Sequence, residues 1–209
     1  MPPQGVKATR MELLNLKKKI ALAEKGHRLL KEKRDALISE FFTVIEDVDK
    51  TREEVEEKLF RAFRVLIAAE GLLGVSTLRD ISRGVRKEAT LRAGVRSVMG
   101  VRLPVFEVVD VEKDTAERGY GVAFTSSVLD RTVKEFEEAL ALIVELAEIE
   151  ESARRLAEEI NKTKRKVNAL EYILIPKLKE KANYIESSLE EMERENFSRL
   201  KLIKSRITE

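Results

Sequence analysis

The chain has 209 residues, enough for one compact domain or one elongated helical protein. Lysine and arginine number 40 against 38 aspartate and glutamate, so the formal net charge is only +2 although 37% of the residues are charged. Aromatic residues make up 5%, tryptophan is absent and prolines number 4, which is typical of long helices and coiled coils rather than of sandwiches or barrels. The balanced charge argues against a nucleic-acid-binding protein.

Residue counts exclude several kinds of site. With no cysteine and a single histidine, the chain has neither a thiolate nucleophile nor a histidine cluster for a metal ion. A phosphate-binding loop is also missing, because Gly94 and Gly100 lack the Gly-Lys-Ser/Thr ending that grips phosphate, and Gly119-Tyr120-Gly121 is interpreted as a loop. We expect no catalytic residue, no cofactor and no metal.

No apolar run approaches the roughly 20 residues that a membrane span needs. The start, Met1-Pro-Pro-Gln, lacks the charged and apolar regions of a signal peptide. We therefore expect a soluble intracellular protein without direct insertion into a membrane.

The distribution of glycine divides the chain into two arms and an insert, because glycine and proline are poorly tolerated inside helices. We expect an N-terminal tail over 1–8, a first coiled-coil helix over 9–70, a central insert over 71–125 and a second coiled-coil helix over 126–209. The glycines of the insert are Gly71, Gly74, Gly84, Gly94, Gly100, Gly119 and Gly121.

The first arm has the strongest signal in the sequence. Thr9 and Glu12 stand three residues apart, the spacing of a capping box, directly before an apolar series that alternates steps of three and four over about six heptads. Charged residues fill most of the positions between. The expected seam of this arm includes Leu13, Leu16, Ile20, His27, Leu30, Arg34, Leu37, Phe41 and Val44.

The second arm repeats this design after a similar start at Ser127 and Asp130. Pro176 interrupts it, and because proline lacks a backbone donor we expect a kink there. The expected seam runs through Leu129, Val133, Phe136, Leu140 and Ile143, and then through Leu156, Ile160, Val167, Leu170 and Leu174.

The two arms differ in length. At 1.5 Å per residue they would measure roughly 90 and 120 Å, so in an antiparallel pair the last part of the second arm, 193–209, would project as a single helix. In the insert, residues 89–98 and 103–111 are expected strands around a Met99-Gly100-Val101 turn. The predicted fold class is mainly α, a long antiparallel two-helix left-handed coiled coil with a short central insert containing a β-hairpin.

Polar residues on the arms have two interpretations each. His27, the only histidine, lies on the seam, where polar residues commonly fix register or partner, although a catalytic base is the other possibility. The basic clusters Lys17-Lys18-Lys19, Lys31 to Arg34 and Lys162 to Lys166 either pair with acidic residues of the opposite helix or dock against an acidic surface of a larger partner.

Longer blocks of sequence resemble a known family. The opening Thr9-Arg10-Met11-Glu12-Leu13-Leu14-Asn15-Leu16-Lys17, the run from Ala23 to Asp35 with its Gly26-His27-Arg28-Leu29-Leu30, and the block Arg165 to Tyr172 followed by Ile175-Pro176 resemble the D subunit of the archaeal/vacuolar-type (A-type/V-type) rotary ATPases. Ala8 departs from the proline that often precedes the opening Thr-Arg in that family. The resemblance covers essentially the whole chain and is weakest in the insert.

The resemblance implies a non-catalytic central-stalk rotor subunit of an ATP synthase that translocates protons or sodium ions. Its implied partners are the A/B catalytic hexamer and the F and C subunits of the same complex. Its implied location is cytoplasmic, peripheral on the cytoplasmic face of the membrane through the complex. From terminal location and charge we expect a contact with the catalytic head through Arg10, Lys17, Lys18, Leu200, Ile203 and Ile207.

Three other interpretations stay open at this point. A prefoldin-like coiled-coil chaperone subunit also joins two long helices through β-hairpins, but these arms are longer. The γ subunit of F-type enzymes needs a larger insert than residues 71–125, and an enzyme would have to show turnover by the purified chain.

Overall fold

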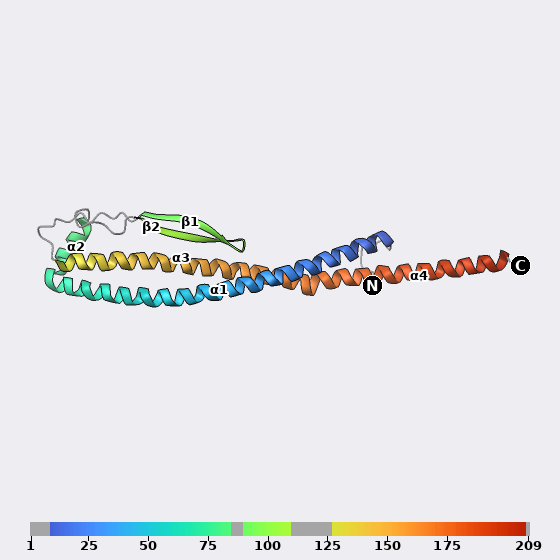
Figure 1. The fold of residues 1–209 in the computed structure, drawn as a ribbon, viewed down its shortest axis with the longest axis horizontal. Helices are drawn as coiled ribbons and strands as arrows, with labels where there is room; N and C mark the ends of the chain where they lie inside the picture. The colour runs from blue at the N-terminus through green and yellow to red at the C-terminus, as the bar shows by residue number, and fades with distance from the viewer. Residues whose placement is uncertain (1–8, 85–89, 110–126, 208–209) are drawn as a thin grey trace. The chain divides into compact units, whose positions relative to one another are not determined.

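The structure, a computed structural model, describes residues 9–84, 90–109 and 127–207, with side chains described as far as Lys204. It falls into two compact units, Met1–Ala36 with Ile160–Glu209, and Leu37–Glu159. The first helix runs through both units. In chain order (Figure 1) the elements are α1 (Arg10–Leu73), α2 (Val75–Gly84), β1 (Thr90–Val98), β2 (Val101–Val109), α3 (Ser127–Ala169), the π turn η2 (Leu170–Leu174) and α4 (Ile175–Ile207).

Helix α1 begins and ends at residues whose chemistry explains the boundary. At the start, the N–H of Glu12 donates to Oγ1 of Thr9 at 3.2 Å, so the Thr9 hydroxyl caps a free donor of the first turn. At the other end, Gly74 has φ +81, a left-handed conformation that favours glycine, and its N–H donates to the Glu70 carbonyl at 3.0 Å. Helix α2, which the sequence pattern did not predict, starts at the next residue.

In the second unit, α1 and α3 bury a stripe of apolar side chains between them. The rings of Phe63 and Phe136 pack edge to face with centroids 5.5 Å apart, a favourable arrangement of two aromatic rings. The predicted fold class, a coiled coil of long helices with a β-hairpin insert, is confirmed. The buried apolar residues of this stripe are Leu37, Val44, Val48, Val55, Ala62 and Ala69 on α1, and Leu129, Ala139, Ala153 and Leu156 on α3.

The buried stripe on the first half of α3 differs from the sequence expectation. Leu140 and Ile143 were expected in the seam, but 40% and 38% of their surfaces are exposed, whereas Thr132 and Ala139 are buried. The buried positions carry small or hydroxyl-bearing side chains, which a pattern of bulky apolar residues does not mark. Thr132 is buried at little cost because its hydroxyl donates to the Val128 carbonyl at 2.8 Å.

In the first unit, α1 and α4 share a compact apolar cluster. Leu16 of α1 packs with Ala182 and Ile185 of α4, and all three are buried. Partly buried apolar residues surround this centre, so the stripe continues along both helices of the unit. These surrounding residues are Leu13, Ile20, Leu178 and Leu189.

A π turn stands where Pro176 was expected to distort the second arm. Over Leu170–Leu174 the helix widens, and the N–H of Ile175 donates to the carbonyl of Leu170, five residues back. The wider turn takes up an extra residue and changes the phase of the side chains. Leu174, expected in the seam, is therefore 43% exposed. A kink at Pro176 stays a prediction.

The hairpin closes through a two-residue turn rather than the expected three-residue one. Val98 pairs with Val101 across Met99 and Gly100, which have φ +50 and +82, as a type I′ turn requires. β2 therefore starts two residues earlier than expected. Residues 89, 110 and 111, expected in the strands, and Gly119-Tyr120-Gly121 lie outside the described residues.

Candidate partner-binding surfaces

In the first unit, the two helices are joined by ion pairs that repeat every heptad. Arg10 pairs with Glu193 at 2.5 Å and Lys17 with Glu186 at 3.0 Å. One heptad further along α1 the signs are reversed, and Glu24 pairs with Lys179 at 2.7 Å. Each step of seven along α1 is matched by seven in the opposite direction along α4. The pairs therefore specify an antiparallel register, because a shifted register would bring like charges together.

The second unit has a charge cluster between α1 and α3. Nζ of Lys58 lies 3.0 Å from Oε2 of Glu135 and also contacts Glu138, and all three side chains are partly buried. Hydrogen bonds to the two carboxylates raise the pKa of Lys58, and the bond from Lys58 holds the pKa of Glu138 below its usual range. One exposed pair, Arg52 with Glu150 at 2.7 Å, joins the same helices.

The expected seam residues are buried, half-buried or exposed, and the exposed ones are Leu140, Ile143 and Leu174. Those that are buried lie on the stripes described above. The half-buried ones flank it, which is the place of larger or polar side chains in a two-helix pair. Buried are Leu16, Leu37, Val44, Leu156 and Val167, and half-buried are Leu13, Ile20, His27, Leu30, Arg34, Phe41, Ile160 and Leu170.

His27 is placed beside the π turn. Its Nε2 lies 3.4 Å from Oε2 of Glu171 across the helix pair, and its side chain is 22% exposed. No nucleophilic side chain is recorded in contact with it among the described residues. The geometry matches a polar residue that joins two helices, which is the register interpretation of a seam histidine.

The residues expected to contact a catalytic head differ in what they already bind. Arg10 and Lys17 are engaged by Glu193 and Glu186, yet 78% and 54% of their side chains stay exposed. Lys18 is exposed and carries no ion pair within the described ranges. Thus Arg10 and Lys17 are held in place by α4 and still reach solvent.

The last turns of α4 expose apolar side chains. From Glu190 to Lys204 every residue is exposed, including Leu200 at 65% and Ile203 at 55%. Phe197, which the heptad pattern did not single out, precedes Leu200 by three residues and is 71% exposed. Spacings of three place these side chains on one face of a helix. The side chain of Ile207, the last expected contact, lies outside the described residues.

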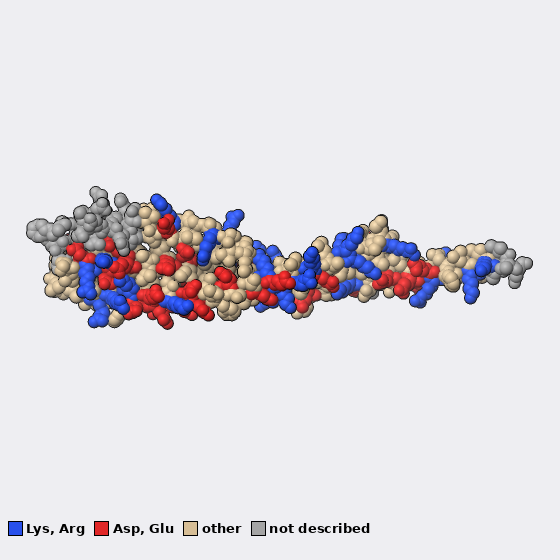
Figure 2. Space-filling model, viewed as in Figure 1, with Lys and Arg blue, Asp and Glu red and all other residues tan. Residues whose placement is uncertain are grey.

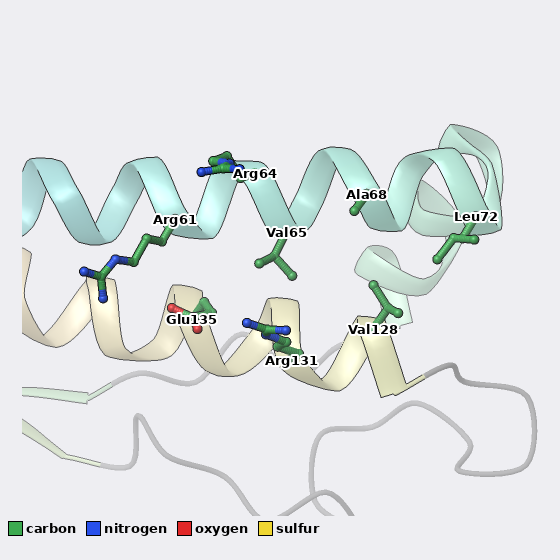
Figure 3. A pocket seen from close by; sticks show the side chains of 8 residues that line it. All are labelled: Arg61, Arg64, Val65, Ala68, Leu72, Val128, Arg131 and Glu135. Atoms are coloured by element: carbon green, nitrogen blue, oxygen red, sulfur yellow. The ribbon is translucent and has the colours of Figure 1, made fainter.

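A groove of about 550 Å³ lies between α1 and α3. Figure 3 shows Val65 and Leu72 of α1 pointing toward α3, with Val128 facing them. Arginines line the rim of the groove. Along the rest of the face that Figure 2 shows, basic and acidic side chains alternate. The sequence pattern did not predict this groove, because its lining comes from two helices that are far apart in the chain. Its rim arginines are Arg61, Arg64 and Arg131.

The hairpin is anchored to α3 by a contact that the sequence did not indicate. The backbone N–H of Phe106 donates to Oε2 of Glu148 at 2.6 Å, and Leu103 is 1% exposed. Glu148 was one of many acidic residues on a predicted helix, and only the tertiary arrangement distinguishes it. β1, in contrast, is exposed from Thr90 to Ser97.

Over the described ranges, no helix combines the length and apolar character that a membrane span requires. The same residues contain no group of three or more histidine, aspartate or glutamate side chains arranged to hold a metal ion.

The chain is similar in sequence to D subunits of ATP synthases. The sequence profile of the ATP synthase D subunit matches residues 12–205. The A-type ATP synthase D subunit of Pyrococcus furiosus is 50% identical over 96% of this chain and 94% of its own length. The proteins of the same name from Thermococcus sibiricus and Methanosphaera stadtmanae are 50% and 48% identical over 96% and 98% of this chain, covering 94% and 96% of their own lengths. These matches give no support to a prefoldin-like chaperone, and the chain belongs to the D-subunit family of ATP synthases.

Proposed function

We propose that this chain is the central-stalk rotor subunit of an A/V-type ATP synthase, proton- or sodium-translocating, and that it couples ATP synthesis or hydrolysis in the catalytic head to rotation of the membrane ring. The observation that carries the proposal is the near-full-length identity of 48–50% to proteins named as D subunits of A-type ATP synthases. The chain itself does no chemistry, since its partners supply the nucleotide sites.

The helix pairs support a mechanical role. Torque transmission requires that two helices do not slide past one another, and sliding by one turn would separate every heptad-spaced ion pair at once. Arg10–Glu193, Lys17–Glu186 and the reversed Glu24–Lys179 oppose such sliding in the first unit. Exposed pairs are each worth only about 0.2–1 kcal/mol, so resistance comes mainly from the interlocked apolar stripe, with the charges fixing its register.

Two paired helices also lack threefold symmetry. Inside a ring of three A and three B subunits, such a pair presents a different surface to each catalytic interface. Differential contacts of this kind bias each site toward a different conformation, and they link rotation angle to nucleotide affinity. The proposed head contact comprises Arg10, Lys17, Lys18, Leu200, Ile203 and Ile207, and the exposure of the first five agrees with it.

The partners in this proposal are the A/B hexamer at the two chain ends, and the F and C subunits at the insert and the adjoining helices. The protein is then peripheral on the cytoplasmic face, held there through the complex. The arginine-lined groove and the exposed hairpin are the described surfaces available on that part of the chain.

A coupling assay tests the head contact. In the reconstituted complex, deletion of residues 194–209 together with neutralisation of Arg10, Lys17 and Lys18 is expected to leave ATP hydrolysis but to reduce rotation of a bead on the rotor and ion-driven ATP synthesis. Leu22→Ser, a polar change at a 72% exposed position of α1 outside the contact, is the control. Intact coupling in the deletion variant would show that the contact is assigned wrongly. Failure of the unaltered chain to co-purify with the complex would refute the rotor role itself.

A further inference from the structure

Within the part of the chain that the structure describes, no strand pairs with the outer edge of β1, and this edge offers a regular row of backbone groups. Because the Phe106 N–H points to Glu148 and away from β1, the Ala93–Phe106 pair belongs to the non-hydrogen-bonded type. In such a pair the N–H and C=O of both residues point outward. Alternation along an antiparallel ladder gives Leu91, Val95 and Ser97 the same orientation as Ala93, so four residues present donors and acceptors on the outer edge.

Pro104 supports this geometry independently. It lies opposite Val95 within the ladder, at a position whose missing N–H would have pointed away from β1. Proline is tolerated in a strand where no ladder hydrogen bond is lost. The hydrogen-bonding pattern of the hairpin is therefore fixed by two residues, Phe106 and Pro104, as well as by the turn.

β1 lacks most of the features by which proteins protect an exposed edge. It is nine residues long, pairs with β2 without a bulge, and contains neither proline nor lysine. Leu91 and Val95 are 53% and 71% exposed. An isolated two-stranded hairpin is only marginally stable, and a third strand would add both hydrogen bonds and apolar cover.

The charge of the hairpin indicates what kind of strand fits. Its described residues carry three arginines and one glutamate, a net charge of 3 − 1 = +2. Arg92 and Arg96 lie on one face of β1 and make no ion pair with any residue in the described ranges, and the structure records none between Arg92 and Glu107 opposite it. A third strand next to β1 would place its own side chains opposite these two arginines.

We propose that β1 binds an extended, acidic strand of another protein of the complex, which adds to the free edge as a third strand of the sheet. Glutamate or aspartate of that strand lies opposite Arg92 and Arg96, and apolar residues lie opposite Leu91 and Val95. A second copy of this chain is disfavoured as the occupant, because the full-length antiparallel pairing of two β1 strands, centred on Gly94, would set Arg92 opposite Arg96 of the other copy, and like charges directly opposite are destabilising.

The proposal rests on the proposed function, because the partner is sought within the ATP synthase. Hydrogen exchange with single-residue resolution tests it. The chain alone and the chain in the assembled complex are compared. We expect the outward amides of Leu91, Ala93, Val95 and Ser97 to exchange quickly in the isolated chain and slowly in the complex. Equal rates in a complex that contains the chain would overturn the added strand and leave the proposed function standing, whereas failure of the chain to enter the complex would refute the proposed function.

Variants and a defined probe identify the occupant. A nine-residue peptide of alternating valine and glutamate is expected to bind the chain, and its valine–lysine counterpart is not. Arg92→Glu with Arg96→Glu is expected to weaken the acidic peptide by roughly tenfold, since two cross-strand attractions become repulsions. Arg102→Glu, which lies on the opposite face of the hairpin, is the matched control.

Val95→Pro removes an outward N–H without removing a β1–β2 hydrogen bond, so it is expected to abolish peptide binding while the helical circular dichroism stays unchanged. Equal binding of both peptides, or of the acidic peptide to all variants, would overturn the proposal. The proposal would also be overturned if the unaltered chain dimerised and Val95→Pro abolished that dimer, because a second copy of the chain would then be the occupant of the β1 edge.

Discussion

Replacement of Leu156 by alanine is expected to be among the most destabilising single changes in α3. The Leu156 side chain is 0% exposed, so all of its surface is lost from the buried stripe. Removal of three carbon atoms costs about 2.4 kcal/mol in transfer free energy, and incomplete closure of the cavity raises the loss to about 3 kcal/mol. For a chain of this size the midpoint of thermal unfolding should fall by roughly 6–12 °C.

The matched control is Leu140→Ala on the same helix and in the same unit. Leu140 is 40% exposed, so the same chemical change removes less buried surface and leaves no enclosed cavity. Its expected cost is about 1 kcal/mol, a shift of roughly 2–4 °C. Circular dichroism at the helix minimum, recorded during heating, measures both. If Leu140→Ala destabilised the protein as much as Leu156→Ala, the position of the buried stripe on α3 would be assigned wrongly.

Two further predictions concern charge. Lys58→Met should lower the free energy of unfolding by about 1–2 kcal/mol at pH 7, because it leaves two carboxylates facing each other. The folded-state pKa of Glu138 is depressed, so its contribution to the free energy of unfolding is present above its ordinary pKa of 4.5 and is lost as the pH falls through the folded-state pKa. The pKa of Lys58 is raised, so the contribution of Lys58 to the free energy of unfolding is lost only above pH 10.5. Urea denaturation at pH 7 and pH 3 should therefore show a smaller effect of the substitution at pH 3, and an equal effect would contradict the cluster. Separately, hydrogen bonds from the two arginines that follow on α3 lower the pKa of Glu151 to about 2, so carbon-13 NMR of its carboxyl group should show no titration near pH 4.5.

The architecture was largely predictable because a heptad repeat is a local property. The apolar series of the first arm predicts a long helix with one buried stripe, and Leu16 and Leu37 lie on it. Thr9 marked the start of α1 for the same reason, since a cap involves residues only three apart. These signals do not depend on what the helices pack against.

The phase of α3 was not predictable from side-chain size. Ala139 rather than Leu140 is buried, because the close approach of two helices selects a small side chain where the backbones are near, and that distance is a tertiary property. The π turn before Pro176 was also not predictable from the sequence, because its form depends on tertiary packing. Proline indicates that the local hydrogen bonding must change, but how the helix changes depends on the packing of its neighbours.

By itself, the sequence determined the long helices of the two arms, the presence of a hairpin between them and the family, since each depends on short-range spacing or on long blocks of residues that can be matched directly. Only the tertiary structure decided which opposite charges meet across the helix pair, that Glu148 holds β2 by a backbone amide, and that β1 is left with an open edge. Contacts between residues far apart in the chain depend on register, and a composition rich in both charges allows many registers until the apolar stripes of two helices interlock.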